Sequence, residues 1–224
     1  MFADPEERTK VKICGITSLQ DARFTAGALA HYMGFIFYED SPRYVDPAKV
    51  GAIINWLEGP EYVGVFVNQP LDDVNMLGRQ TGIDYVQLHG NENPDYCSLV
   101  DKPIIKAIHV SEDDSGSDLK KRVEPYLDHV EYFLFDTKVE GKWGGTGQSF
   151  DWSVLDEVAG SVPYFLSGGL NVDNVRTACE LVHPYAVDVS SSLESEPGVK
   201  DYKKIENFMN EMRNIWDKQE MGDL

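Results

Sequence analysis

Eight short runs of apolar, β-branched and aromatic residues recur along the chain at similar intervals. They cover residues 11–16, 32–38, 62–68, 85–89, 104–110, 132–137, 164–170 and 186–191, and successive runs start 19 to 32 residues apart. A hairpin needs only a few linking residues, whereas neighbouring parallel strands need a crossover of about a dozen or more. The spacing therefore predicts eight parallel strands, each followed by a longer connection.

The stretches between these runs have the features of helices. Asp46 followed by Pro47 is typical of an N-cap and a first-turn proline, and it predicts a helix over residues 48–57. Asn171 is expected to cap a helix over residues 172–182, and apolar residues spaced three and four apart between Ile205 and Trp216 mark the last helix. Eight strand–helix units in 224 residues describe one α/β domain, a (β/α)₈ or TIM barrel.

The main alternative is an open, doubly wound sheet, which has a G-x-G-x-x-G fingerprint after its first strand. The sequence CGIT stands there instead, at residues 14–17, and no linker rich in Pro, Gly or Ser divides the chain. We expect the barrel to span residues 10–218, with an acidic extension at residues 1–9 and a C-terminal tail at residues 219–224.

Charge and cysteine content exclude several classes of function. With 20 Lys and Arg against 38 Asp and Glu, the net charge is −18, which disfavours binding to nucleic acid or to an anionic membrane. Cys14, Cys97 and Cys179 are too few and too scattered for a disulfide framework or a zinc site. The first residues lack the basic and apolar regions of a signal peptide, so we expect a cytoplasmic protein without a metal.

Active sites of such barrels lie at the carboxyl ends of the strands, on positions that point inward. Alternation along the first, fourth, sixth and eighth strands turns polar groups into the barrel: Lys12, Cys14, Gln87, His89, Asp136, Asp188 and Ser190. Each has a purely structural interpretation too. Cys14 could be an inert core residue, Asp136 a turn cap, and Gln87 with His89 a satisfied buried pair.

Four loops complete the predicted rim. Gly168-Gly169 and the serines at 190–192 follow the seventh and eighth strands, where barrels of this kind commonly bind phosphate through backbone N–H groups. Arg43, after the second strand, is either a surface residue or a clamp for a substrate carboxylate. The glycine-rich segment 141–147 is either a surface turn or a lid over the site.

Motifs at these positions follow one another in a recognisable order. They are KICGIT (12–17), GFIFY (34–38) with SPRYV (41–45), GVFVN (64–68), VQLHG (86–90), FDT (135–137), GGTGQSFDW (144–152), LSGGLN (166–171) and VDVSS (187–191). Together they resemble the phosphoribosylanthranilate isomerase family of tryptophan biosynthesis, from about Lys10 to the last helix. The resemblance implies a cofactor-free Amadori rearrangement of N-(5′-phosphoribosyl)anthranilate to 1-(2-carboxyphenylamino)-1-deoxy-D-ribulose 5-phosphate.

The resemblance also implies residue roles. Cys14 resembles the family's general base and Asp136 its general acid, while Arg43 resembles the group that binds the anthranilate carboxylate. The implied phosphate site and the remaining substrate contacts comprise Gly168, Gly169, Ser190, Ser191, Gln87, His89 and Asp188. The expected ligand is thus a small phosphorylated molecule, and a monomer and a homodimer are both compatible with the sequence.

General acid–base catalysis requires the pKa values of Asp136 and Cys14 to shift. Asp136 can protonate the ribose ring oxygen only if its pKa rises from about 3.9, and Cys14 can act as a thiolate only if its pKa falls from about 8.5. Lys12, two positions before Cys14, could assist the base. Ser192 departs from the family, which more often has glycine there, and a positive φ would strain a serine.

Two other functions fit these residues less well. A histidine-pathway isomerase of the same fold would be expected to have aspartates ending the first and fifth strands, where this chain has Cys14 and Lys106 or His109. A non-catalytic phosphate-binding barrel would be expected to lack Cys14 or Asp136, and both are present.

Overall fold

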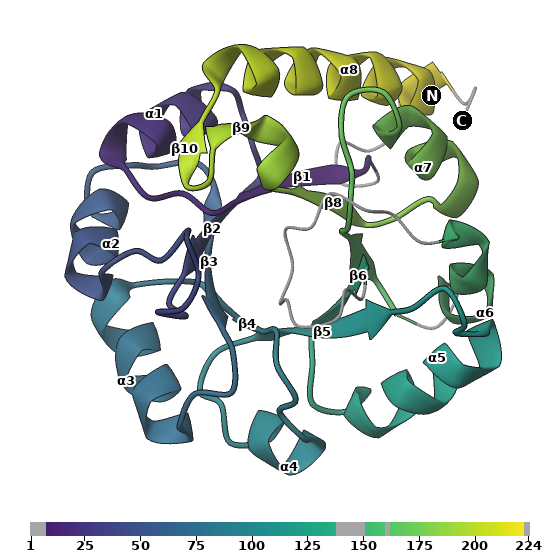
Figure 1. Cartoon of the computed structure of the whole chain (residues 1–224), viewed down its shortest axis with the longest axis horizontal. Coiled ribbons are helices and arrows are strands. Elements are labelled where there is room, and N and C mark those ends of the chain that lie inside the picture. Colours follow the sequence, from purple (N-terminus) through teal and green to yellow (C-terminus); the bar gives the residue numbers. More distant parts are fainter. Residues whose placement is uncertain (1–7, 138–150, 160–161, 222–224) are drawn as a thin grey trace.

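The computed structural model describes residues 8–137, 151–159 and 162–221. Among these residues, eight parallel strands close into a barrel in which each strand pairs with the next and β8 pairs with β1, with helices around it (Figure 1). The strands are β1 (Lys10–Cys14), β2 (Tyr32–Ile36), β3 (Glu61–Phe66), β4 (Tyr85–Leu88), β5 (Ile104–Val110), β6 (Tyr132–Thr137), β7 (Tyr164–Leu166) and β8 (Ala186–Val189). The helices are α1 (Leu19–Gly27), α2 (Pro47–Ile54), α3 (Leu71–Thr81), α4 (Pro94–Cys97), α5 (Gly116–Val123), α6 (Asp156–Ala159), α7 (Val175–Val182) and α8 (Tyr202–Met221). The predicted barrel is confirmed.

Strand alternation separates two apolar clusters. The smaller one fills the barrel with inward side chains: Tyr32, Val63, Ile105, Ala107, Leu134, Phe165 and Ala186. The larger one joins outward strand residues such as Val11 and Ile13 to helix residues such as Val50 and Met209. Because successive side chains of a strand point to opposite faces, Lys12 and Cys14 then face the barrel interior, as alternation predicted.

Tyrosine hydroxyls close the amino-terminal end of the barrel. Tyr185 Oη lies 2.9 Å from Tyr32 Oη and accepts hydrogen bonds from Tyr132 Oη at 3.1 Å and from Lys10 Nζ at 2.9 Å. Burial raises the pKa of Tyr32 and of Tyr132, whereas the three donors outweigh burial at Tyr185 and lower its pKa. Buried hydroxyls therefore satisfy one another at this end, and the opposite end is left for the site.

Two helix boundaries differ from the sequence-based expectation. α2 begins at Pro47 behind the Asp46 cap, as predicted, but it ends at Ile54. α7 begins at Val175 instead of residue 172. The reason is local: Asn171 accepts a hydrogen bond from the N–H of Asp173 and donates its own N–H to Asn174 Oδ1, which forms a turn ahead of the helix.

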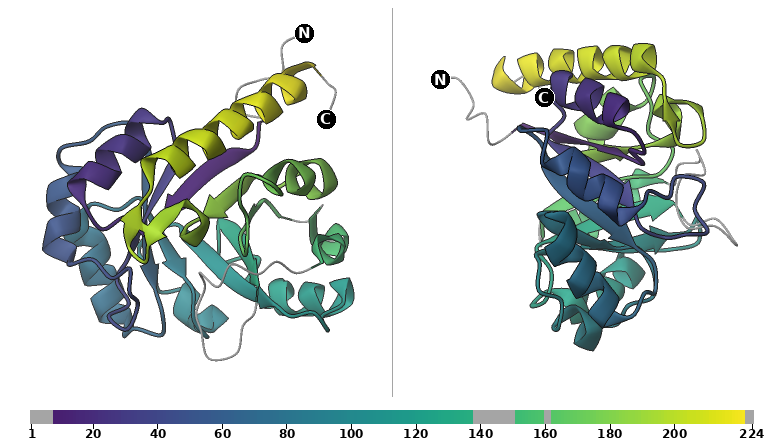
Figure 2. Two further views of the ribbon diagram at one scale, coloured as in Figure 1. Left: turned by 45° about the horizontal axis from the view of Figure 1, so that its top comes forward. Right: turned by 90° about the vertical axis from the view of Figure 1, so that its left-hand side faces the viewer.

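The chain after β8 adds a short unit before the last helix. A 3₁₀ helix, η3 (Ser191–Leu193), leads into an antiparallel hairpin of β9 (Glu194–Glu196) and β10 (Val199–Lys200). α8 then packs against α1 and α7 and follows the outside of the barrel (Figures 1 and 2). No helix in the described ranges has the length and apolar content to span a membrane.

α8 continues to Met221, past residue 218, where the barrel is expected to end. Gln219 anchors that last turn: its amide oxygen accepts the N–H of Thr9, and its amide nitrogen contacts Thr9 Oγ1 at 3.1 Å. The segment 141–147, expected to be a turn or a lid, lies outside the described residues. Two further short 3₁₀ helices complete the described structure: η1 (Glu124–Tyr126) and η2 (Trp152–Leu155).

Candidate active site

All ten side chains or loop residues predicted from the sequence lie around two adjoining pockets at the carboxyl ends of the strands. One pocket is lined by Cys14, Arg43, Gln87, His89, Asp136, Asp188 and Ser190, among others. The second shares Asp136, Asp188 and Ser190 with the first and is lined further by Gly168, Gly169, Ser191 and Ser192. These residues, which belong to six strands or to the loops after them, therefore meet at one end of the barrel.

Cys14 ends β1 and is 6% exposed. Its neighbour in the sheet is Gly34 of β2, and a Cβ at that glycine would lie 2.6 Å from the Cys14 sulfur. Gly34 therefore leaves the space that the thiol occupies. Burial raises the pKa of Cys14, and the nearby Lys12 and Lys200 only partly offset this effect. The expected lowering of its pKa is thus wrong for the ligand-free protein, because the removal of water outweighs the two ammonium groups.

Lys12 and Asp188 form a buried ion pair beneath the pocket. Lys12 Nζ lies 2.9 Å from Asp188 Oδ2, with the two side chains 0% and 7% exposed. Burial alone would lower the pKa of Lys12, but its neighbours, Asp188 above all, raise it overall, so the ammonium form is favoured. Asp188 Oδ1 has no hydrogen-bond partner among the described residues, and Asp188 lines both pockets. It can therefore accept a hydrogen bond from a ligand.

A chain of polar contacts leads to Asp136 at the end of β6. Gln87 Nε2 lies 2.9 Å from His89 Nδ1, and His89 Nε2 lies 3.3 Å from Asp136 Oδ2. The N–H of Thr137 donates to Asp136 Oδ1 at 2.9 Å. The contact between the Gln87 amide and Nδ1 fixes the His89 ring so that Nε2 faces Asp136 Oδ2. Gln87 and His89 are therefore placed to orient the carboxyl group.

His109 of β5 joins this chain from the side. Its Nε2 lies 3.0 Å from the carbonyl oxygen of His89, and the two rings meet edge to face. Burial, with a smaller contribution from His89, lowers the pKa of His109 to about 4. Ligand atoms of His89, His109 and Asp136 lie within 4.8 Å of one another, so these three could hold a metal ion. The metal-free reaction expected from the sequence stays a prediction.

Gly168 and Gly169 have φ values of 90° and 67°, which favour glycine. A Cβ at Gly168 would lie on Thr137 Oγ1 and 2.7 Å from the Thr137 nitrogen. Ser192, in contrast, lies in η3 and is not among the positive-φ residues of the described chain. The strain considered for this serine is therefore absent, and its buried hydroxyl has no hydrogen-bond partner in the described structure.

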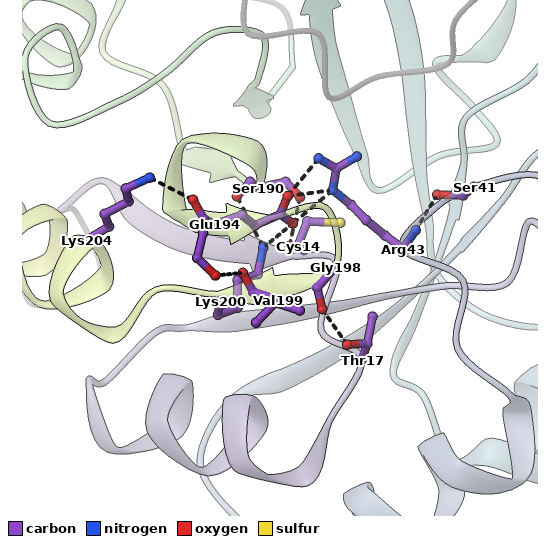
Figure 3. A network of polar contacts seen from close by, with 11 residues as sticks. Cys14, Thr17, Ser41, Arg43, Ser190, Glu194, Gly198, Val199, Lys200 and Lys204 are labelled. Carbon is purple, nitrogen blue, oxygen red and sulfur yellow. Dashed lines mark hydrogen bonds and ion pairs between the residues drawn. The ribbon is translucent and has the colours of Figure 1, made fainter.

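Arg43 lies at the pocket rim, but its guanidinium group already contacts a carboxylate that the sequence did not indicate. Arg43 Nε lies 2.9 Å from Glu194 Oε1, and Nη2 lies 2.7 Å from Glu194 Oε2 (Figure 3). Lys200 Nζ reaches the same carboxylate at 3.0 Å. Glu194 looked like one more acidic residue in a chain of net charge −18, and no local pattern marked it.

The fifth strand bears on the alternative function, a histidine-pathway isomerase, which would be expected to have an aspartate at its end. Ile105 and Ala107 belong to the cluster inside the barrel, so Lys106 points outward, where its Nζ lies 2.7 Å from Glu92 Oε2. Of the two residues that the sequence suggested for the end of this strand, Lys106 and His109, only His109 lies near Asp136. The fifth strand therefore ends without an aspartate at the position that the histidine-pathway rival requires.

The model of the N-(5′-phosphoribosyl)anthranilate (PRA) isomerase family matches residues 11–211. The chain belongs to this family. The N-(5′-phosphoribosyl)anthranilate isomerase of Geobacter metallireducens is 43% identical over 201 residues, which cover 89% of this chain and 96% of that protein. The isomerase of Citrifermentans bemidjiense is also 43% identical, over 92% of this chain and 98% of its own length.

Solved structures of the PRA isomerase family share the fold. The phosphoribosylanthranilate isomerase of Thermotoga maritima superposes with a TM-score of 0.84 at 36% identity, covering 92% of this chain and 99% of its own. An isomerase in complex with reduced 1-(o-carboxyphenylamino)-1-deoxyribulose 5-phosphate superposes with a TM-score of 0.81 at 35% identity, over 92% of this chain and 99% of the other. The resemblance recognised from the motifs is thus confirmed.

Proposed function

We propose that this chain isomerises N-(5′-phosphoribosyl)anthranilate to 1-(2-carboxyphenylamino)-1-deoxy-D-ribulose 5-phosphate, with Asp136 as general acid and Cys14 as general base. The observation that supports these roles is that both side chains line one pocket, which adjoins a second pocket built from glycine and serine backbone. Membership of the PRA isomerase family supports the activity. An acid, a base and an anion-binding loop are the groups that this cofactor-free reaction needs.

The second pocket is suited to the substrate's phosphate. Gly168 and Gly169 stand between β7 and α7, and Ser190 and Ser191 follow β8, so backbone N–H groups of both loops border the pocket. Backbone N–H groups at loop–helix junctions are common anion ligands, and glycine lets the anion approach the backbone closely. Binding there would place the ribose ring over the pocket that Asp136 and Cys14 line.

The first chemical step opens the ribose ring. Asp136 donates a proton to the ring oxygen, the bond from that oxygen to C1 breaks, and the nitrogen lone pair forms a C1=N double bond. The ring oxygen leaves as the C4 hydroxyl group, and an iminium cation remains. Because Asp136 Oδ2 faces His89 Nε2 at 3.3 Å, His89 is placed to hold the carboxyl group during this transfer.

The second step needs a base only after the cation exists. Burial keeps Cys14 a thiol in the free protein, since its pKa is raised. A positive charge on the neighbouring iminium favours the thiolate by Coulomb attraction, as does Lys12. Cys14 then takes the proton from C2, and the electron pair forms C1=C2 and neutralises the nitrogen. The resulting enolamine becomes the ketose when a proton is lost from the C2 hydroxyl and one is added at C1.

The proposal is tested by following the loss of substrate fluorescence with wild type, Cys14→Ala and Asp136→Asn. A positioned acid or base contributes about 10²–10⁴-fold, so we expect each variant to lose at least a hundredfold in kcat while still binding a reduced product analogue. Cys97→Ala is the control, because Cys97 is buried in α4, away from both pockets. An inactive wild type would overturn the function, and full activity in Cys14→Ala would overturn the base assignment.

We expect a monomer or a homodimer, a cytoplasmic location, and no role for nucleic acid. One relative, the isomerase of Thermotoga maritima, is described as dimeric. We also propose the division expected from the sequence, with the barrel over residues 10–218 between an acidic extension at residues 1–9 and a C-terminal tail at residues 219–224.

A further inference from the structure

We propose that Glu194 is the positioning residue of Arg43, and that the hairpin β9–β10 thereby makes the site selective for a substrate with a carboxylate on its aromatic amine. The inference rests on the proposed function, because it takes Arg43 as the group that meets the anthranilate carboxylate. It adds a residue that acts through Arg43 and is not placed in contact with the substrate.

The geometry of the ion pair leaves one edge of the guanidinium group for a ligand. A guanidinium group has five N–H donors in a plane, and Glu194 engages the edge formed by Nε and Nη2 at 2.9 and 2.7 Å. The side-chain hydrogen bonds of Arg43 to other described residues use only Nε and Nη2, and Arg43 lines the pocket with Cys14. The Nη1–Nη2 edge can therefore bind a second carboxylate through two parallel hydrogen bonds.

Glu194 can fix the orientation of the Arg43 guanidinium group because Glu194 is itself fixed by several polar contacts. Lys200 Nζ lies 3.0 Å from Glu194 Oε1 and donates to the carbonyl oxygen of Ser190 at 3.2 Å. Lys204 Nζ donates to the backbone carbonyl of Glu194 at 2.7 Å (Figure 3). The side chains of Glu194 and Lys200 are 3% and 0% exposed, so the carboxylate has little room to swing.

Close backbone contacts place the β9–β10 hairpin beside Arg43. Thr17, after β1, donates its hydroxyl to the carbonyl of Gly198 at 2.6 Å. Gly198 has a φ of 84°, and a Cβ there would lie 3.0 Å from the carbonyl oxygen of Pro42. At Gly15, a Cβ would lie 2.8 Å from Arg43 Cδ, so the missing side chain makes room for the arginine. The loops after β1 and β2 and the hairpin thus enclose the Arg43 side chain.

Charge explains why such a fixed arginine selects for a carboxylate. Arg43, Lys200 and Glu194 together carry one net positive charge within a protein of net charge −18. The Arg43 side chain is only 12% exposed, so its remaining donors have limited access to water. A ligand with a carboxylate pairs with these donors, whereas a ligand without one leaves them poorly solvated.

The test compares two ligands that differ in one group: reduced 1-(2-carboxyphenylamino)-1-deoxyribulose 5-phosphate and the same compound without the carboxyl group. Glu194→Asp keeps the charge but withdraws the carboxylate by one methylene. We expect at least tenfold weaker binding of the first ligand and a change below twofold for the second, by calorimetry. KM should rise by a similar factor, with kcat within about threefold of wild type. Glu196→Asp, on the exposed strand position two residues away, should change neither affinity.

Two further measurements separate positioning from general damage. In an Arg43→Ala background, Glu194→Asp should leave the ratio of the two affinities unchanged, because the group that it positions is gone. Gly198→Ala, which pushes the hairpin from Pro42 without altering a charge, should lower the same ratio. Equal weakening of both ligands in Glu194→Asp, or an unchanged ratio, would overturn the positioning role while the wild-type activity still supports the function. A wild type without turnover would instead overturn the proposed function.

Discussion

Replacing Lys12 by methionine tests whether the buried ion pair under the pocket is essential to the fold. Lys12 and Asp188 are 0% and 7% exposed, and their charged atoms lie 2.9 Å apart. Methionine fills a similar volume but leaves the carboxylate of Asp188 buried beside an apolar chain. Breaking a buried pair in this way costs about 3–5 kcal/mol, a large part of a typical total stability of about 5–15 kcal/mol.

That cost can be converted into a melting temperature. For a chain of this size, 1 kcal/mol corresponds to about 2–4 °C, so Lys12→Met should melt about 6–20 °C below wild type at pH 7. The loss should shrink toward pH 5, because burial raises the pKa of Asp188 and a protonated carboxyl needs no partner. Thermal unfolding followed by tryptophan fluorescence, at pH 7 and pH 5, measures both effects.

A second variant shows whether the unpaired charge is the cause. Lys12→Met combined with Asp188→Asn removes both charges and keeps both shapes, so it should recover at least half of the lost stability. If the double variant is no more stable than Lys12→Met alone, the loss comes from packing and the electrostatic reasoning is refuted. A single variant as stable as wild type would refute it more directly.

Two other predictions concern pH and the phosphate loop. The pKa of His109 is about 4 in the folded chain and about 6.5 when unfolded, so the unfolded state binds more protons between these values. The free energy of unfolding should therefore fall as pH drops from about 6.5 to about 4, and urea titrations of His109→Gln should show a smaller fall; an equal fall would contradict this. Gly168→Ala places a Cβ against Thr137 at a φ of 90°, so we expect stability to fall by about 1–3 kcal/mol and inorganic phosphate to bind at least tenfold more weakly by calorimetry. Wild-type phosphate affinity in this variant would show that the loop tolerates the side chain.

The strands and the direction of their side chains could be predicted because both are encoded locally. Alternation alone placed Lys12, Gln87 and Asp188 inside the barrel, since a strand turns every second side chain to the same face. Helix starts were less predictable: Asn171 has the chemistry of a cap, but Asn174 turns the same residues into a turn before the helix. Which of two cap-forming residues begins a helix depends on the packing of the loop.

Contacts distant in sequence were beyond prediction from residue patterns. Glu194 meets Arg43 across 151 positions, and nothing near either residue indicates the pair. The pKa of Cys14 was expected to fall because the base must ionise, yet burial raises it in the free protein. How deeply Cys14 is buried depends on the whole closed barrel. A cysteine at the end of a predicted strand therefore does not reveal how its pKa is shifted.

The pairing of β8 with β1 has a consequence for how the protein is made. Lys12 and Asp188 lie 176 positions apart and become neighbours only when the last strand closes the barrel. The hairpin that holds Arg43 is synthesised later still, just before α8. A nascent chain therefore carries Cys14, Arg43 and, once β6 is made, Asp136 without the pocket that they later line together. Activity should arise abruptly, when the final helix leaves the ribosome.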